Sequence, residues 1–328
     1  MILVTGGAGF IGSNLLAALE QRGHSNLAVC DRLGHGDKWR NIAKREIAQF
    51  VPPEDLAGFL SHQQGAIDAV LHLGAISATT ETDADLIVRT NLILSLALWD
   101  WCAETQVPFI YASSAATYGD GAAGFDDDGS CAALARLRPL NAYGWSKHAF
   151  DRIVARHVAE DRPRPPQWAG LKFFNVYGPN EYHKGDMISV VRRVHSQIRD
   201  TGRCTLFKSH REGIADGGQR RDFVAVDDCV AAMLWLLDNP DVCGLFNLGT
   251  GTDRSFAELA EAVFAAIGEP VRIDYVDMPL PIRDRYQYFT KAAMDRLRGA
   301  GYQRAFTSLE DGVKAYVCGH LEADDPYR

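Results

Sequence analysis

Residues Ile2–Ser13 read ILVTGGAGFIGS, a short apolar run followed directly by a glycine-rich turn. Apolar residues then recur at helical spacing, so the segment predicts a strand, a tight turn and a helix. Glycines lack a Cβ atom, which lets the backbone turn sharply and approach a pyrophosphate whose charge is stabilised by the helix N-terminus. The G-x-x-G-x-x-G spacing of Gly6, Gly9 and Gly12 differs from the better-known G-x-G-x-x-G, but the strand and helix around it predict a dinucleotide-binding site.

A second apolar run, Leu27–Cys30, ends in Asp31, roughly 20 residues after the glycines. An acidic side chain at this place binds the hydroxyl groups of the adenosine ribose and favours NAD. Arg32 follows directly and Lys38 lies close behind, and two cations there would bind a 2′-phosphate and favour NADP. The residues leave both cofactors open, with NADP preferred.

Along the rest of the chain, short apolar runs alternate with amphipathic stretches. We expect further strands at Ala69–Ala75, Val107–Ser114, Leu171–Val176, Arg221–Val226 and Gly244–Leu248, and helices from about Tyr143, over Met187–Arg199 and over Cys229–Leu237. The alternation predicts an α/β fold, a Rossmann-type doubly wound parallel sheet with a smaller α/β substrate-binding lobe.

The polar, glycine-punctuated stretch Tyr177–Gly185 marks a departure from the sheet. We therefore expect a dinucleotide-binding domain at residues 1–174, to which residues 222–250 return, and a substrate domain at residues 175–221 and 251–328.

Helix starts carry their own signals. Asp227 or Asp228 is expected to cap the helix that follows, because a short acidic side chain can accept a free backbone N–H. Ser255–Glu258 and Thr307–Glu310 both fit the capping box, in which a hydroxyl and a carboxylate satisfy each other's backbone donors.

Composition excludes several classes of protein. The 328 residues are 47% hydrophobic and 23% charged, ordinary values for a globular protein. A net charge of −8 argues against general binding to nucleic acid or to an anionic membrane. Apolar stretches such as Val230–Leu237 fall far short of the roughly 20 residues that span a bilayer, and no charged lead-in of a signal peptide precedes Ile2.

Seven cysteines are an odd number and form no C-x-x-C pair. Scattered thiols of this kind are typical of a reduced, cytoplasmic protein rather than of a disulfide frame. The ten histidines show no ligand spacing such as H-E-x-x-H, so no metal site is expected. We expect a soluble cytoplasmic enzyme without a metal ion.

Tyr143 and Lys147 lie four residues apart at the head of a predicted helix, so both side chains share one face. A nearby cation lowers the pKa of a tyrosine from its ordinary value near ~10, which would make Tyr143 a general base. For a bare Y-x-x-x-K, a buried tyrosine beside a solvated lysine is the commoner situation. Ser114 changes this balance, because it ends a predicted strand at the edge of the sheet where ligands bind.

Together these motifs resemble the extended short-chain dehydrogenase/reductase superfamily. The resemblance covers nearly the whole chain and rests on Thr5–Gly12, Ser113–Gly119, Tyr143–Lys147, Arg221–Val224 and Asn247–Gly251. Many members of that superfamily act on nucleotide-linked sugars. The resemblance implies that Tyr143, Lys147 and Ser114 are catalytic.

Within the superfamily, FNVYGPNEYHKG at Phe174–Gly185 is similar to the ADP-glyceromanno-heptose 6-epimerase family. Ser113–Gly119, Leu140–Tyr143 and Arg285–Gln287 support the similarity. That family converts ADP-D-glycero-D-manno-heptose to its L-glycero epimer and so supplies heptose for the lipopolysaccharide core. The similarity implies an ADP-heptose substrate and a homo-oligomer such as a pentamer.

The chemistry of such a reaction requires more than one proton-handling group. The inverted carbon, C6″, is a carbinol whose C–H is not acidic, so oxidation to a ketone by NADP followed by hydride return is the feasible route. The ketone must expose its opposite face before the hydride returns, and one base cannot easily serve both geometries. The family resemblance assigns the second acid/base to Lys184, which spacing alone would leave as a solvated loop lysine.

The resemblance also implies the residues around each ligand. Beside the glycine turn, the cofactor would be lined by Phe10, Ile11, Asp31, Arg32, Lys38, Leu73, Gly74, Ala75, Ile76, Ser77, Asn91, Lys147 and Val176. The substrate would be lined by Asn175, Asp186, Arg193, Phe207, Lys208, Ser209, His210, Arg221 and Tyr286. Lys147 would orient the ribose, Ser114 would hydrogen-bond the reacting oxygen, and Arg221 matches a pyrophosphate in geometry. Asp186 and Arg193 differ from the serine and histidine that the family leads us to expect.

Two alternatives remain at this stage. One is another nucleotide-sugar enzyme, such as a UDP-hexose 4-epimerase or a 4,6-dehydratase, although dehydratases usually carry an acidic pair where this chain has Ala115–Thr117. The other is a non-catalytic NADP-binding sensor or scaffold, against which the intact set of Ser114, Tyr143 and Lys147 argues. The sequence leaves open which epimer Tyr143 and Lys184 each serve.

Overall fold

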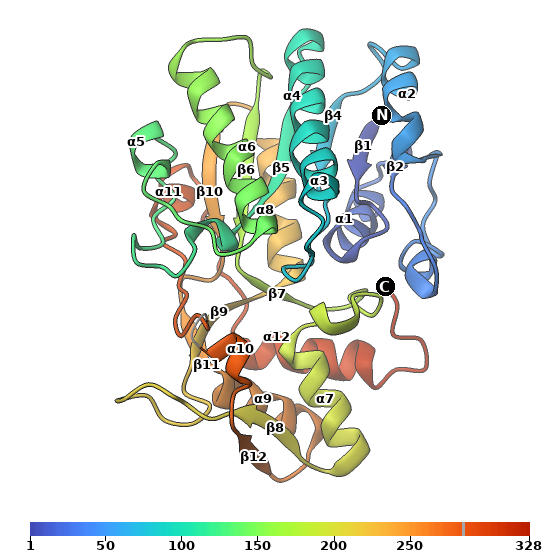
Figure 1. Cartoon of the computed structure of the whole chain (residues 1–328). Helices are drawn as coiled ribbons and strands as arrows, with labels where there is room; N and C mark the ends of the chain where they lie inside the picture. The colour runs from blue at the N-terminus through green and yellow to red at the C-terminus, as the bar shows by residue number, and fades with distance from the viewer. Residues whose placement is uncertain (284–285) are drawn as a thin grey trace.

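A computed structural model describes residues 1–283 and 286–328, so Arg285 of the similarity above lies outside the described residues. Its upper region in Figure 1 is built on one parallel sheet. The strands are β1 (Ile2–Thr5), β2 (Leu27–Cys30), β3 (Gln49–Val51), β4 (Ala69–His72), β5 (Phe109–Ser114), β6 (Trp168–Phe173) and β10 (Gly244–Leu248). Their order is β10-β6-β5-β4-β1-β2-β3, and every pairing is parallel. The predicted fold class is confirmed.

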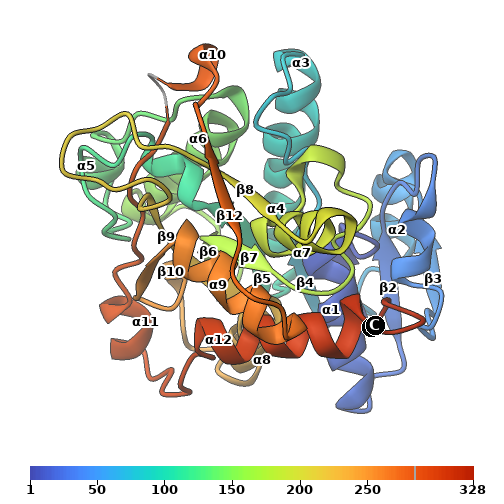
Figure 2. The same ribbon diagram turned by 90° about the horizontal axis from the view of Figure 1, so that it is seen from below.

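Helices cover both faces of this sheet, as Figure 2 shows from below. One face carries α1 (Phe10–Gln21), which packs against α8 (Val226–Asp238). The other carries α6 (Ala142–Ala159), which packs on the helical segment of α3 (Ala84–Ile87), η3 (Val88–Ile93) and α4 (Leu94–Thr105). The strands between them are almost wholly apolar and buried, as expected for parallel strands enclosed by two helical layers.

Residues Ala84–Thr105 form one helical run that, by length and composition alone, is apolar enough to cross a membrane. This corrects the expectation that every apolar stretch falls far short of that length. Trp99 lies on the buried side of this run, where its ring packs edge-on against Phe109 of β5 and Phe150 of α6. The buried side of the helix therefore belongs to the core of the large sheet.

The lower region in Figure 1 contains two small sheets and its own apolar core. Strands β7 (Asn175–Tyr177), β9 (Arg220–Ala225) and β11 (Asp253–Ser255) pair in the order β11-β9-β7, and β8 (Cys204–Phe207) pairs with β12 (Ile273–Val276). Helices α7 (Val190–Thr201), α9 (Phe256–Ile267) and α12 (Leu309–Tyr316) pack around them. Shorter elements are η1 (Asp37–Asn41), η2 (Pro53–Asp55), α2 (Leu56–His62), η4 (Ala115–Tyr118), α5 (Cys131–Leu134), η5 (Gly185–Met187), α10 (Leu280–Arg283), α11 (Asp295–Gly299) and η6 (Val317–Leu321).

The chain crosses from the large sheet to the small one within a single residue. We expected one strand over Leu171–Val176, but β6 ends at Phe173 and β7 begins at Asn175. Phe174 lies between them, and its backbone N–H donates to Leu248 O of β10 at 3.1 Å. The residues after β7 therefore leave from the carboxyl edge of the large sheet.

Several predicted helix starts need correction. The helix expected at Met187 begins at Val190, because Ser189 Oγ accepts the N–H of Arg192 and caps it there. Asp227 and Asp228 do not cap α8 but lie in its first turn, where their charges face the positive end of the helix dipole.

Of the two predicted capping boxes, one is present in the structure and the other is not. The box of Ser255 and Glu258 is confirmed at the start of α9. The box expected at Thr307 is wrong by one residue, since Ser308 caps α12 and accepts the N–H of Asp311 at 3.1 Å. Thr307 instead donates its N–H to Asp228 of α8 at 2.7 Å.

Candidate active site

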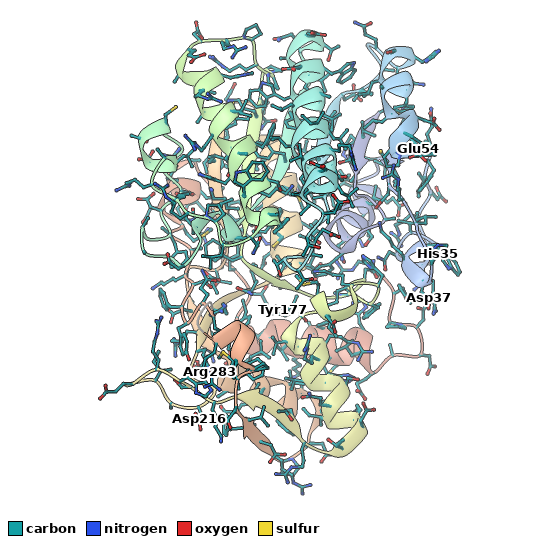
Figure 3. The ribbon with its side chains drawn as sticks, viewed as in Figure 1. His35, Asp37, Glu54, Tyr177, Asp216 and Arg283 are labelled. Atoms are coloured by element: carbon teal, nitrogen blue, oxygen red, sulfur yellow. The ribbon has the colours of Figure 1, made fainter. Side chains whose placement is uncertain are left out.

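A cavity of about 590 Å³ lies between the carboxyl edge of the large sheet and the lower region. Figure 3 labels Tyr177, which ends β7 at the level where the two regions meet and lines this cavity. Of the predicted site residues, the cavity is lined by Gly6, Gly9, Phe10, Ile11, Gly12, Asp31, Lys38, Leu73, Gly74, Ala75, Ser77, Ser114, Tyr143, Lys147, Asn175, Val176, Lys184, Asp186 and Arg221. Residues from seven separated segments of the chain thus meet at one place, as expected for the carboxyl edge of such a sheet.

The glycine turn packs too closely for larger residues. A Cβ on Gly12 would lie 2.2 Å from Gly6 O, and one on Gly6, whose φ is +67°, would lie 2.6 Å from Gly74 N. No side chain caps the N-terminus of α1, so its first N–H groups remain for a ligand. This cradle fits the pyrophosphate of a dinucleotide.

Asp31 and Lys38 form the ribose side of the cradle. Asp31 accepts the N–H of Ala8 at 2.9 Å, and Lys38 Nζ lies 2.6 Å from its other carboxylate oxygen. Arg32 does not line the cavity; its exposed guanidinium pairs at 3.0 Å with Glu54, which Figure 3 labels at the outer edge of the molecule. Such an exposed pair is weak, so the guanidinium can exchange this partner for a phosphate. An acid and one cation in the ribose pocket, with a second cation outside it, fit NAD(P).

Ser114, Tyr143 and Lys147 are brought together where α6 meets the end of β5. The first turn of α6 is fixed by Asn141, whose Oδ1 accepts the N–H of Gly144 at 2.8 Å. A Cβ on Gly144 would lie 2.7 Å from Ala116 O, so glycine allows the helix to touch the turn after β5. As a result Tyr143 and Ser114 line the cavity together, and the Ser114 hydroxyl acts on the pKa of the Tyr143 phenol.

The pKa values in this cluster differ from the expectation. Burial raises the pKa of Tyr143, and the hydrogen bond with Ser114 opposes that rise. Burial lowers the pKa of Lys147 to about 8, and the charge of Asp151 opposes that fall. The expected net lowering of the Tyr143 pKa is therefore wrong for the protein alone, because desolvation is the largest influence on that pKa.

A buried ion pair lies behind this cluster. Asp151, one turn after Lys147 on α6, is fully buried and lies 3.0 Å from Lys172 Nζ of β6. It also accepts hydrogen bonds from Ser113 Oγ at 2.7 Å and Tyr111 Oη at 3.1 Å. These three partners satisfy a carboxylate that would otherwise be costly to bury, and they fix the helix face that presents Lys147.

Lys184 reaches the same cavity from the loop after β7. Its Nζ lies 5.2 Å from the centroid of the Phe10 ring at the start of α1. Burial lowers the pKa of Lys184, and the charge of Glu181 opposes that fall.

The loop that carries Lys184 is fastened to α1 and η1. Asn14 Nδ2 donates to Pro179 O at 2.9 Å, and Asn180 Nδ2 donates to Ser13 Oγ at 3.0 Å. Asn41 Nδ2 lies 3.0 Å from His183 Nδ1 and donates to it. The loop is thus tied to the glycine turn by side chains rather than by a regular backbone ladder.

Ile76 and Asn91 are close to the cavity but do not line it. Asn91 is fully buried, accepts the N–H of Ile76 at 2.8 Å and donates to Ile76 O at 2.9 Å. The amide therefore holds the backbone of residues 73–77, whose other members line the cavity.

Among the expected substrate residues, Arg221 is the best placed by geometry. It is 8% exposed, lines the cavity, and its guanidinium lies 5.4 Å from the centroid of the Tyr286 ring. Tyr286 packs edge-on against Phe207, so both lie near Arg221 without lining the cavity. Arg193 is also outside the lining and donates to Asp186 O at 2.9 Å.

The segment Lys208–His210 follows β8 and does not line the cavity. Ser209 N donates to Asp216 Oδ1 at 2.8 Å, and His210 N donates to Tyr288 Oη at 3.0 Å. These contacts hold the segment beside Tyr286, since the rings of Tyr286 and Tyr288 pack edge-on.

Some lining residues were missed by the sequence analysis. The structure adds Thr79, Ala112, Ser113, Ala115, Ala116, Phe173, Phe174, Tyr177, His183, Met187, Ile188, Ser189, Val190, Val191, Phe223, Leu259, Gln287 and Thr290. His183 and Gln287 could have been predicted, because they adjoin the predicted site residues Lys184 and Tyr286 in the sequence. Gln287 Nε2 donates to Gly119 O at 2.8 Å and so joins two segments of the cavity wall.

Comparison with known proteins gives consistent relatives. The model of the NAD dependent epimerase/dehydratase family matches residues 2–249. An ADP-L-glycero-D-manno-heptose-6-epimerase of Nitratidesulfovibrio vulgaris is 49% identical over 329 residues, covering 100% of both chains. The crystal structure of the Helicobacter pylori ADP-L-glycero-D-manno-heptose-6-epimerase matches with a TM-score of 0.80 at 27% identity, over 97% of this chain and 95% of that one. The Thermus thermophilus UDP-glucose 4-epimerase in complex with NAD matches with a TM-score of 0.75 at 26% identity, over 97% of each chain.

Proposed function

The chain belongs to the NAD dependent epimerase/dehydratase family and within it to the ADP-L-glycero-D-manno-heptose-6-epimerases, and from this premise we propose its reaction and its residues. It inverts C6″ of ADP-D-glycero-D-manno-heptose to give the L-glycero epimer, which supplies heptose for the lipopolysaccharide core. The observation that carries the proposal is that Tyr143 and Lys184, from opposite regions, line one cavity with the glycine turn. A UDP-hexose 4-epimerase is not favoured, because heptose epimerases are 45% and 49% identical over the full length, whereas the UDP-glucose 4-epimerase is 26% identical.

We propose NADP as the resident cofactor, bound by the glycine turn, residues 73–77, Lys147 and Val176. NADP held there would supply reversible hydride transfer at C6″, so that oxidation to a ketone and reduction back leave no net redox change. Lys38, with Arg32 beside it, supplies the positive charge for a 2′-phosphate. Lys38→Ala is therefore expected to lower the preference for NADP over NAD by about tenfold, the effect of roughly 1.4 kcal/mol of lost interaction.

In this proposal the chain handles the protons from two sides. Of Tyr143 and Lys184, one takes the proton of the C6″ hydroxyl and the other gives a proton to the ketone oxygen after the ketone has exposed its opposite face. Ser114 hydrogen-bonds the reacting oxygen, and Lys147 orients the ribose. Arg221 binds the pyrophosphate of the ADP-heptose substrate, and the neighbouring aromatic ring of Tyr286 packs against its guanidinium.

The organisation of the chain follows the same proposal. We assign residues 1–174 and 222–250 to the dinucleotide-binding domain and residues 175–221 and 251–328 to the nucleotide-sugar domain. Two separate apolar cores support the division, although β9 pairs with strands of the lower region. We also propose a homo-oligomer, such as a pentamer, in the cytoplasm; the cysteines of the described residues are all free thiols, which suits a reducing compartment.

One assay tests the function. The purified protein is given ADP-D-glycero-D-manno-heptose and, separately, UDP-galactose, and the stereochemistry of each product is followed by NMR. We expect inversion at C6″ of the heptose and no turnover of the UDP sugar. Turnover of the UDP sugar alone would overturn the proposal, and identifying the nucleotide that copurifies decides between NADP and NAD.

A further inference from the structure

We propose that Glu181 is a positioning residue for Lys184: its buried carboxylate closes the loop that carries Lys184 and places a negative charge near the lysine ammonium group. The inference rests on the proposed role of Lys184 in epimerisation. Glu181 does not line the cavity. In this inference it nevertheless affects the chemistry of the cavity through Lys184.

Glu181 is fully buried at the base of the loop of residues 181–189. Its carboxylate accepts hydrogen bonds from the backbone N–H of Ser189 and, at 2.6 Å, from the Ser189 hydroxyl. Within the loop, Lys184 N donates to Glu181 O at 3.1 Å and Met187 N donates to Lys184 O at 2.9 Å. Because Ser189 also caps α7, the carboxylate ties the loop to a fixed helix end.

The charges of Glu181 and Lys184 each stabilise the ionised form of the other side chain. Burial lowers the pKa of Lys184, and the negative charge of Glu181 opposes this fall. Burial raises the pKa of Glu181, and the Ser189 hydrogen bonds and the Lys184 charge oppose that rise. In a poorly solvated loop this mutual attraction favours the protonated lysine, which an acid/base group must be able to reach.

Three titratable neighbours of the pair, His183, Tyr182 and Tyr316, carry no charge near neutral pH, whereas the carboxylate of Asp186 and the guanidinium of Arg192 also lie close by. Burial lowers the pKa of His183 to about 4, so its ring carries no charge there. Burial raises the pKa values of Tyr182 and of Tyr316 from α12, so both phenols stay protonated. The charge that raises the pKa of Lys184 against the effect of burial is that of Glu181.

The direct test is a titration of Lys184 in the whole protein without substrate. The chain has eight lysines, so lysine labelled with 13C at Cε gives few NMR signals, and the signal lost in Lys184→Arg belongs to Lys184. We expect Glu181→Gln to move the titration midpoint of Lys184 to lower pH by on the order of one unit. Glu322→Gln is the matched control, since Glu322 pairs with Arg199 and His195 and its loss should leave the midpoint unchanged.

An unchanged midpoint in Glu181→Gln overturns the proposal, and so does an equal shift in Glu322→Gln. If Glu181→Gln does not fold, the same NMR titration of the wild-type protein provides the test. The chemical shift of Lys184 should then change a second time, at acidic pH, when Glu181 is protonated. A single-step curve then overturns the proposal.

A pH profile of epimerisation separates electrostatic from merely structural effects. In Glu181→Gln the limb that belongs to Lys184 should move with the NMR midpoint, whereas a loop that is only loosened loses rate equally at every pH. Failure of the proposed function is seen separately, as absence of heptose epimerisation in the wild-type protein, and leaves the NMR midpoints as the test of Glu181.

Discussion

Lys147 and Lys184 line the same cavity, yet the chain holds them in different ways. Lys147 lies inside a regular helix, is 4% exposed, and has the buried Asp151 one turn further along the same helix. Lys184 lies on a loop whose shape depends on side chains of α1, η1 and α7. A helix keeps its geometry through its own backbone, whereas such a loop keeps it only while each tertiary contact is made.

This difference suggests a division of tasks. A rigid helix suits a group that must hold a cofactor and a tyrosine in fixed geometry during both half-reactions. A loop fastened at several points suits the group that meets the substrate from the other region. The comparison therefore predicts that changes around Lys184 act mainly on epimerisation, while changes around Lys147 act on cofactor binding and stability as well.

The largest effect is expected for Tyr143→Phe. Removing the phenol hydroxyl takes away one proton-handling group, so kcat should fall by about 10²–10⁴-fold while the cofactor stays bound. Tyr302→Phe is the matched control, because Tyr302 is also buried and its hydroxyl has no partner among the described residues. Near-normal epimerisation by Tyr143→Phe would remove Tyr143 from the mechanism.

A smaller effect is expected for Asn180→Ala. Asn180 is fully buried, has a left-handed φ of 71°, donates to Ser13 Oγ and accepts the N–H of Arg328 at 2.9 Å. Alanine loses both contacts and resists this φ, so Lys184 should be displaced and kcat should fall by about tenfold to a hundredfold.

The control for Asn180 is Asp161→Ala, since Asp161 also has a positive φ, 49°, but is exposed at the end of α6. Its kcat should stay within about twofold of wild type, because a distant surface change rarely exceeds 0.5 kcal/mol. Equal kcat values for Asn180→Ala and wild type would show that the position of Lys184 does not depend on the contacts of Asn180.

Lys147 is also expected to make the free energy of unfolding depend on pH. The pKa of Lys147 is lowered by burial to about 8, well below its ordinary value of 10.5. Between these values the unfolded chain binds more protons than the folded one, so Lys147 makes the free energy of unfolding rise with pH across this window. The rise is on the order of 3 kcal/mol at most and should disappear in Lys147→Met.

Denaturant unfolding at several pH values between 8 and 10.5 measures this difference. Lys314→Met, at an exposed position of α12, is the matched control. If the free energy of unfolding depends on pH in the same way in the wild-type protein and in Lys147→Met, the account of Lys147 is contradicted, because its burial then has no effect on its pKa.

The same comparison explains how much the sequence could predict. The glycine turn, Ser114 and the pair Tyr143 and Lys147 follow from local spacing, because a strand end and an i, i+4 helix pair are short-range features. Lys184 had no such signal and was found through the family resemblance.

Other features depend on contacts between distant segments. Nothing in Leu171–Val176 indicates that the sheet changes at Phe174, since this break is set by pairing with other strands. The early start of α8 follows from its place after β9 rather than from a capping residue. Asn180 in a left-handed conformation likewise depends on Ser13, which lies far away in the sequence.

The most direct measurement for the central claim is epimerisation by Lys184→Met, with both heptose epimers and with products read by NMR. If Tyr143 and Lys184 handle protons from two sides, the variant should lose about 10²–10⁴-fold in kcat in both directions and keep its cofactor. Near-normal epimerisation by Lys184→Met would contradict the two-group account and leave Lys184 a lysine of the loop.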